Sequence, residues 1–174
     1  EHKDVRLPIM ICQDGFITSH AVENIELLED AEVKGFVGEY EPENYLLNPE
    51  CPMAVGPYSV TDFYMEAKRN QAEGMKHVEK VVLDVARDFA EMSGREYGLF
   101  EAYKLEDADR AVVMIGSAAG TTKDAIDKLR AQGEKVGLLK IRLYRPFPAE
   151  AIAEALKNVK AVAVMDRAEG YTNH

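Results

Sequence analysis

Apolar and polar stretches alternate regularly over residues 109–168, and the alternation predicts strand, helix, strand, helix, strand. The first strand is Ala111–Ile115, an apolar run without polar alternation, which is typical of a strand buried on both faces. It ends at a turn of small residues, 116–120, after which Thr121 is the predicted helix N-cap, with Asp124 completing a capping box. The pattern therefore predicts a buried strand that leads directly into an amphipathic helix.

The second strand, Val136–Leu143, alternates apolar and basic residues, so its second face is expected to be only partly covered. Pro148 suits the first turn of a helix over Ala149–Lys157, because its missing amide donor costs nothing there. The third strand is Ala161–Met165. Strands joined by helices through short turns imply parallel neighbours and right-handed crossovers, so the predicted fold class is α/β with an open, parallel sheet.

The amino-terminal part reads as a further strand and helix. Leu7–Cys12 is predicted to be a buried strand that ends in the tight turn 13–16. Residues 18–20, Thr-Ser-His, are predicted to cap a short helix over Glu23–Leu28. A strand that ends in a turn and is followed by polar residues at a helix start is where α/β folds bind ligands.

The turn after this strand has two interpretations. In one, Asp14 and Ser19 satisfy local backbone amides and His20 lies in a polar pocket. In the other, the loop lies near a cofactor or substrate, and Asp14, Gly15, Ser19 and His20 approach the cleft. The residues alone leave both open.

Residues 35–58 are interrupted by prolines and glycines, which predicts a long irregular connection that is functional or interfacial. Its apolar members are expected to pack onto something, in part onto another chain: Phe36, Tyr45, Leu46, Leu47, Met53 and Val55. One long helix is predicted from Ser59 to about Ser93, with a possible bend at Gly74 and Gly94 as its stop. Its apolar stripe is typical of a core or a subunit interface. A short strand over Tyr97–Tyr103 follows.

Composition narrows the class of protein. The 174 residues are 47% hydrophobic and 30% charged, which is typical of a soluble globular protein. A net charge of −10 argues against nucleic acid or an anionic membrane as a partner. No apolar run approaches about 18 residues and no signal peptide is visible, so the expected location is the cytoplasm. There, Cys12 and Cys51 are expected to be free thiols rather than a disulfide.

Both ends suggest a piece of a longer subunit. Residues 1–6 lead into a strand with no initiator methionine, and residues 169–174 follow the last strand without a helix to cover it. A parallel sheet of three strands buries too little surface to be stable alone. We therefore expect an internal fragment.

The turn over Gly116–Thr121 invites comparison with a phosphate cradle, but it fits none of the known patterns. It is neither G-x-G-x-x-G nor G-x-x-x-x-G-K-[ST], and no acidic residue closes the second strand. Ser117 lacks the spacing of a nucleophile elbow and is interpreted as a turn residue. The four histidines are far apart in sequence, so no metal site and no local catalytic group of acid, base and nucleophile is predicted.

Three segments together carry a family resemblance: DGFITSH at 14–20, GPYSVTDFYMEAKRNQAEGM at 56–75, and IGSAAGT with RLYRPFP within 115–148. In this order and spacing they resemble the alpha subunit of the pyruvate:ferredoxin oxidoreductase (pyruvate synthase) family of 2-oxoacid:ferredoxin oxidoreductases. The resemblance covers nearly the whole chain. It implies that 1–58 is the end of a pyrimidine-binding thiamine-diphosphate domain, 59–95 a long linking helix, and 96–174 an incomplete transketolase C-terminal-like domain.

The resemblance also implies a reaction: a 2-oxoacid, coenzyme A and oxidised ferredoxin give an acyl-CoA, carbon dioxide and reduced ferredoxin. The implied cofactors of the whole complex are thiamine diphosphate with Mg²⁺ and 4Fe-4S clusters, none of them bound by this fragment alone. The implied partners are beta-, gamma- and delta-type subunits or fused equivalents, with ferredoxin as electron acceptor. The fragment would then scaffold the cofactor cleft and the subunit interfaces, and would be inactive when isolated.

The resemblance assigns no catalytic residue to this fragment. The candidate residues of the cofactor cleft are Asp14, Gly15, Ser19 and His20. The candidate interface residues are Arg145, Pro146 and Phe147. Two alternatives stay open: a sibling enzyme for branched-chain 2-oxoacids, 2-oxoglutarate or oxalate, and a non-catalytic interaction module built on a transketolase-type scaffold.

Overall fold

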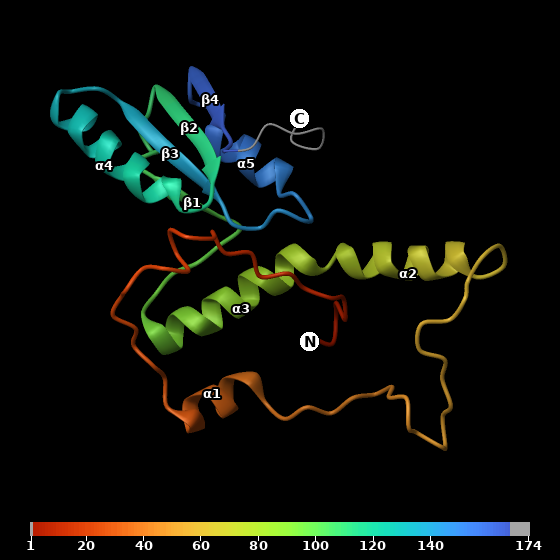
Figure 1. The fold of residues 1–174 in the computed structure, drawn as a ribbon. Coiled ribbons are helices and arrows are strands. Elements are labelled where there is room, and N and C mark those ends of the chain that lie inside the picture. Colours follow the sequence, from red (N-terminus) through yellow and green to blue (C-terminus); the bar gives the residue numbers. More distant parts are fainter. Residues whose placement is uncertain (1, 168–174) are drawn as a thin grey trace. The chain divides into compact units, whose positions relative to one another are not determined.

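The computed structural model describes residues 2–167, and these residues contain a four-stranded sheet. Its strands lie in the order β1-β3-β2-β4, and Figure 1 shows β3, β2 and β4 side by side. Strand β2 (Arg110–Ile115) is parallel to both β3 (Val136–Ile141) and β4 (Ala161–Met165), and β1 (Phe100–Tyr103) pairs with β3 antiparallel. The predicted α/β fold with an open sheet is confirmed, and the antiparallel edge strand makes the sheet mixed.

The chain divides into two units. One contains the residues up to Val22 together with those from Gly74 onward, including the sheet, and the other is the segment Glu23–Glu73. We refer to them as the sheet unit and the arm. The predicted domain boundaries at 58/59 and 95/96 follow the family resemblance and stay a prediction.

Helices cover both faces of the sheet (Figure 1). Because the chain winds from β2 to β3 and then back across β2 to β4, right-handed crossovers place the two connecting helices on opposite faces. Helix α4 (Ala118–Ala131) packs over Leu138, and α5 (Ala149–Leu156) packs over Leu139. Both leucines are 0% exposed. On the face predicted to be only partly covered, Ala119 and Ile126 of α4 bury Leu138, whereas Lys140 and Arg142 are only half-buried, as predicted.

Helix α4 begins earlier than predicted. Its N-cap is Ser117 rather than Thr121, and Ser117 makes no side-chain cap bond to its own helix. The reason is that the Ser117 hydroxyl donates instead to the carboxylate of Asp14. At the other end, Gly133 adopts a left-handed conformation with φ 89°, as a helix stop requires.

The single long helix predicted from Ser59 is wrong, because two helices are present: α2 (Tyr64–Met75) and α3 (Val78–Ser93). The interruption follows Gly74, where a β-carbon would lie 2.9 Å from the Val5 carbonyl oxygen. After it, the His77 amide donates to the Gly74 carbonyl at 3.2 Å, a tighter turn than an α-helix makes. Gly94 ends α3 with φ 69°, as predicted.

The predicted strand Leu7–Cys12 and the predicted helix Glu23–Leu28 are both wrong. Residues 7–12 pair with no strand among residues 2–167, and three consecutive apolar side chains there are exposed: Ile9, Met10 and Ile11. The helix fails because its capping residues are used elsewhere, since the Ser19 hydroxyl accepts a hydrogen bond from the Phe16 amide at 2.9 Å. The residues 169–174, predicted to follow β4 without a helix, lie outside the described residues.

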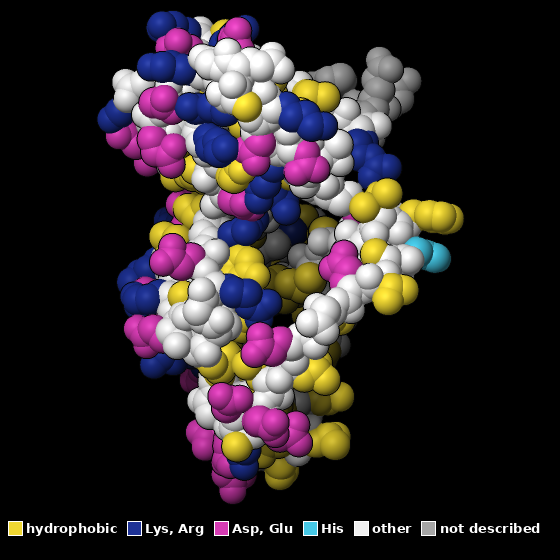
Figure 2. Space-filling model, turned by 90° about the vertical axis from the view of Figure 1, so that its left-hand side faces the viewer, with side chains coloured by type: hydrophobic (Ala, Val, Ile, Leu, Met, Phe, Trp, Pro, Cys, Tyr) yellow, Lys and Arg dark blue, Asp and Glu magenta, His cyan; other side chains and the backbone are white. Residues whose placement is uncertain are grey.

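The arm contains one complete helix, α1 (Asp30–Val37). This helix lies partly in the stretch predicted to be irregular, and a capping box between Glu29 and Glu32 starts it. Within residues 2–167 the apolar residues Leu46 and Leu47 of this stretch are exposed, at 61% and 84%, and their packing onto another chain stays a prediction. Figure 2 shows hydrophobic side chains lying on the surface beside acidic ones.

Two further observations concern the chain as a whole. Cys12 and Cys51 are free and exposed, as expected. Among the helices in residues 2–167, none has both the length and the apolar character needed to cross a membrane.

Candidate functional site

The carboxyl ends of the parallel neighbours β2 and β4 form the candidate site. The strand order reverses between these neighbours, since the chain goes from β2 to β3 on one side and returns to β4 on the other. Open α/β sheets bind ligands outside the carboxyl ends of strands at such a reversal, where helix amides can meet an anion. The turn Gly116–Ser117 follows β2 at this position, and Arg167 follows β4.

A carboxylate of the chain itself occupies this position. The Ser117 amide donates to the Asp14 Oδ2 atom at 2.8 Å, and the Ser117 hydroxyl donates to the same oxygen. The Arg167 Nη1 atom lies 3.5 Å from it. Asp14 thus connects the loop of residues 14–20, which we call the docking loop, to the ends of two strands.

The surroundings of Asp14 favour its charged form. The hydrogen bond from the Ser117 hydroxyl lowers the pKa of the Asp14 carboxyl below its ordinary value, with further contributions from the Ser117 amide and the Arg167 charge. The carboxyl is therefore ionised at neutral pH. An ionised carboxylate at the first turn of α4 also complements the positive end of the helix dipole.

Gly116 is shaped around this carboxylate. Its φ is +87°, a left-handed conformation that glycine adopts without strain. A β-carbon at this position would lie 3.1 Å from both Asp14 carboxylate oxygens. Gly116 therefore leaves room for the Asp14 carboxylate, just as the glycine of a phosphate-binding turn leaves room for the phosphate.

The rest of the docking loop makes local contacts. The Ser19 hydroxyl lies 2.8 Å from His20 Nδ1, and the His20 ring stacks on Phe16 with centroids 4.7 Å apart. Gly15 accepts a hydrogen bond from the Ile17 amide at 2.9 Å. Gly15, Ser19 and His20 are all exposed, whereas the Asp14 side chain is only 25% exposed. Of the four predicted cleft residues, the structure thus brings Asp14 to the sheet and leaves the other three on the surface of the loop.

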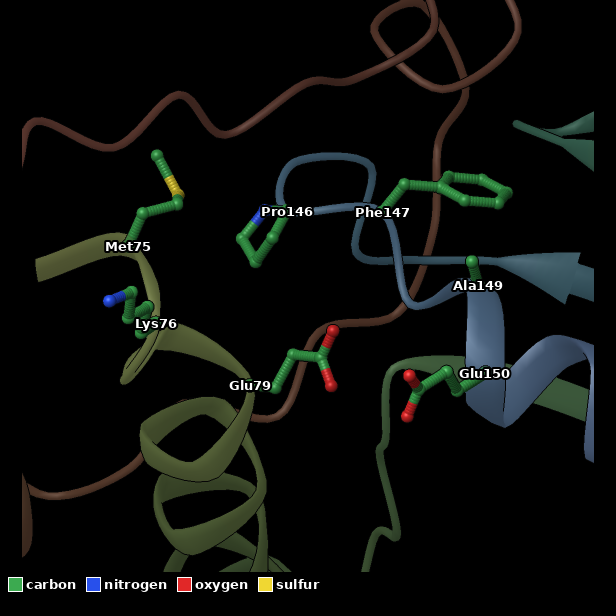
Figure 3. A pocket seen from close by; sticks show the side chains of 7 residues that line it. All are labelled: Met75, Lys76, Glu79, Pro146, Phe147, Ala149 and Glu150. Carbon is green, nitrogen blue, oxygen red and sulfur yellow. The ribbon is translucent and has the colours of Figure 1, made fainter. Parts of the chain in front are cut away.

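The predicted interface residues lie beside a cavity of about 410 Å³ (Figure 3). Pro146 and Phe147 line it from the segment before α5, and Met75 and Lys76 line it from the end of α2 and the turn that follows. The remaining lining residues are Glu79, Ala149 and Glu150. Figure 3 shows the carboxylates of Glu79 and Glu150 pointing toward one another across this space.

This cavity has no arrangement that suggests a reaction. Its lining mixes apolar side chains with charged ones, and Phe147 stays half exposed while its ring meets the Tyr144 ring edge-on at 6.5 Å. Arg145 is exposed as well. A partly apolar, partly charged surface of this kind suits contact with another protein. The interface role of Arg145, Pro146 and Phe147 stays a prediction.

Sequence reasoning missed the partners of Asp14. The sequence pattern indicates Ser117 only as a turn residue, and it does not point to Arg167. Only the strand order could have indicated them, because the turn after β2 and the residues after β4 meet where that order reverses. Within residues 2–167, no three His, Cys, Asp or Glu side chains gather as potential metal ligands.

Comparisons with known proteins agree with this fold. The family description "Pyruvate flavodoxin/ferredoxin oxidoreductase, thiamine diP-bdg" matches residues 1–87, and "Pyruvate:ferredoxin oxidoreductase core domain II" matches residues 108–174. Fold and matches together define an α/β protein in which a region that matches a thiamine-diphosphate-binding domain is followed by a region that matches a core domain. The chain belongs to the pyruvate:ferredoxin oxidoreductase family.

Curated relatives match almost the whole chain. Pyruvate synthase subunit PorA of Thermotoga maritima is 47% identical over 98% of this chain and 44% of its own length. The subunit of the same name from Methanothermobacter thermautotrophicus is 44% identical over 96% of this chain and 43% of its own length. The chain thus spans less than half the length of these relatives.

A solved structure shows a weaker likeness. It is that of 2-oxoglutarate:ferredoxin oxidoreductase from Magnetococcus marinus, which is 24% identical, with a TM-score of 0.45, over 62% of this chain and 16% of its own. A likeness of this strength carries no argument about function.

Proposed function

We propose that this chain is part of a catalytic subunit that oxidises pyruvate with coenzyme A and ferredoxin, forming acetyl-CoA, carbon dioxide and reduced ferredoxin. The observation that carries the proposal is 47% and 44% identity, over nearly the whole chain, to two proteins that are both pyruvate synthase subunits. Branched-chain 2-oxoacids, 2-oxoglutarate and oxalate are the alternative substrates.

Thiamine diphosphate, which the family match over residues 1–87 implies, needs groups that hold its diphosphate and its metal ion. The helix amide that would meet an anion at the strand reversal already binds Asp14, and residues 2–167 contain no cluster of potential metal ligands for Mg²⁺. We therefore propose that the groups that hold the diphosphate and its metal ion lie in the remaining part of such a subunit or in its partners. The 4Fe-4S clusters are likewise assigned to other subunits or domains, because Cys12 and Cys51 are the only cysteines and have no cluster spacing.

The part that we assign to this chain is structural. The docking loop with Gly15, Ser19 and His20 borders the cofactor cleft, and the segment Arg145–Phe147 contacts another subunit of the beta, gamma or delta type. Exposed Ser19 and His20 support the first assignment, since they are available to a neighbouring group. Half-exposed Phe147 supports the second. The assembly works in the cytoplasm.

The activity is tested on the intact assembly, purified under anaerobic conditions. We expect thiamine diphosphate and iron–sulfur clusters in the preparation, and reduction of ferredoxin that requires both pyruvate and coenzyme A. Faster turnover with 2-oxoglutarate, oxalate or a branched-chain 2-oxoacid would identify a sibling enzyme. A preparation without thiamine diphosphate would instead support a non-catalytic interaction module.

The cleft assignment of the docking loop is tested by His20→Ala in the same assembly. We expect turnover to fall about tenfold or more, because an exposed side chain that contacts the cofactor or substrate positions the reacting groups. The matched control is His2→Ala, which removes a half-exposed histidine outside the loop and should leave turnover unchanged. Unchanged turnover and unchanged thiamine diphosphate affinity in His20→Ala would contradict the assignment.

A further inference from the structure

We infer that Asp14 is a positioning residue, which fastens the docking loop to the carboxyl edge of the sheet through Ser117 and Arg167. The inference deepens the proposed function and rests on it in one respect, namely that the docking loop borders the cofactor cleft. The attachment itself follows from the contacts of the described residues.

The first argument is the chemistry of the contact. One Asp14 oxygen accepts hydrogen bonds from the Ser117 amide, at 2.8 Å, and from the Ser117 hydroxyl, while the Arg167 guanidinium lies 3.5 Å away. Hydrogen bonds to an ionised acceptor are about twice as strong as those between neutral groups. The Asp14 carboxylate therefore makes stronger hydrogen bonds to these donors than a water molecule or a neutral side chain would make in its place.

The second argument is shape. Gly116, with φ +87°, leaves open the volume next to both Asp14 oxygens, which a β-carbon would approach to 3.1 Å. An alanine at this position would be strained by its backbone conformation and would also push on the carboxylate. The start of α4 does not account for this opening. Ser117 makes no side-chain cap bond to its own helix, and its hydroxyl donates to Asp14 instead.

The third argument is reach. The bond between Asp14 and Ser117 joins residues 103 positions apart, whereas the recorded hydrogen bonds of Phe16, Ser19 and His20 stay within the loop. The contact also connects the two matched family regions, because Asp14 lies in residues 1–87 and Ser117 in 108–174. Asp14 is thus the point at which the orientation of the docking loop depends on the core domain.

The test is hydrogen exchange measured by mass spectrometry on the intact assembly, following the peptide that contains residues 14–20. Asp14→Ala should accelerate exchange in this peptide about tenfold or more, and Asp14→Asn, which keeps an acceptor oxygen, should give an intermediate rate. The matched control is Asp124→Ala, which removes an exposed carboxylate from α4 and should leave the peptide unchanged. Unchanged exchange in Asp14→Ala would overturn the inference.

Coupling provides the second measurement. Ser117→Ala should also accelerate exchange in the docking loop, and the double variant with Asp14→Ala should exchange no faster than the faster single variant, because both changes remove one contact. Effects that multiply in the double variant would overturn the inference. Hydrogen exchange is measured without turnover, so the two claims are tested separately. An unmodified assembly that does not oxidise pyruvate would refute the proposed function, and accelerated exchange in its Asp14→Ala variant would still support the positioning role.

The connection to the cleft has its own readout. Asp14→Ala should weaken the affinity of the assembly for thiamine diphosphate, while Asp14→Asn should retain part of it. A merely structural role elsewhere would lower the melting temperature without changing this affinity. Normal affinity combined with accelerated exchange would overturn the part of the inference that places the loop at the cleft.

Discussion

The sheet unit and the arm both contain many apolar residues, yet they bury them very differently. Every buried hydrophobic residue among residues 2–167 lies at Val81 or later, and Leu138 and Leu139 at the centre of the sheet are 0% exposed. In the arm, by contrast, Tyr58 is 91% exposed and Leu47 84%. The arm also contains twelve acidic and three basic residues, so nearly all of the net charge of −10 belongs to it.

The difference shows what apolar residues need in order to form a core. In the sheet unit, each strand has a hydrogen-bonded neighbour and each face has a helix, so that apolar side chains point at one another from both sides. The arm has neither sheet partners nor a second layer within residues 2–167, and its excess of carboxylates opposes collapse. Apolar content is therefore not enough for burial without the pairing that brings side chains together.

The largest expected effect comes from removing a central side chain. Leu139→Ala should lower the free energy of unfolding by about 2–5 kcal/mol, because it leaves a cavity between β3 and α5. The measurement is denaturant-induced unfolding, with Leu47→Ala in the arm as the matched control. The control should change stability by less than about 0.5 kcal/mol. Equal effects of the two substitutions would show that the arm has a core of its own.

A smaller effect is expected from adding one methyl group at a crowded glycine. A β-carbon at Gly137 would lie 2.6 Å from the Lys104 carbonyl oxygen, so Gly137→Ala should destabilise the sheet by about 1–3 kcal/mol. A β-carbon added at Gly35 of α1 would have no neighbouring atom within 4 Å. Gly35→Ala should therefore be neutral, or stabilising by up to about 1 kcal/mol. Thermal unfolding of both variants checks the prediction, which fails if the two shifts have the same sign.

The smallest expected effect concerns pH. A hydrogen bond from Lys123 lowers the pKa of the Glu101 carboxyl below its ordinary value, and Arg142 adds to the shift. The pair therefore stabilises the fold above about pH 4.5, the ordinary pKa, and this contribution is lost as the pH falls through the lower, folded-state pKa. Glu101→Gln should remove about 1 kcal/mol of this pH dependence. Glu39→Gln, in an exposed arm pair, is the matched control and should change stability by less than about 0.5 kcal/mol.

The sheet was predictable where local patterns sufficed. Strand β4 was predicted with its observed bounds, and β2 and α5 to within one residue at each end, because short buried runs and a proline at a helix start are local signals. The strand predicted at Leu7–Cys12 failed because a strand exists only with a partner. The long helix failed for a similar reason, since the close approach of Gly74 to Val5 depends on the fold.

The candidate site was predictable only in its separate halves. Both the docking loop and the turn at Gly116 stood out in the sequence, one as a ligand loop and the other as a failed phosphate cradle. Nothing local reveals that the Asp14 carboxylate fills the turn, because the two lie 103 positions apart. The turn at Gly116 matches no phosphate-binding pattern because the carboxylate of Asp14 occupies it.

The open side of β4 has a practical consequence for handling the protein. This strand pairs with β2 on one side, has no strand on its other side among residues 2–167, and leaves Val162, Val164 and Met165 at least 44% exposed. An uncovered apolar edge offers hydrogen-bonding groups to any similar strand, which is how edge-to-edge aggregation begins. Lys160 and Arg167 near its two ends are each paired with a carboxylate of the chain, Asp109 and Asp14, so they give the edge little charge of its own. Repulsion between copies comes instead from the net charge of −10, and low ionic strength, at which that repulsion is least screened, is therefore the condition under which concentrated solutions should keep best.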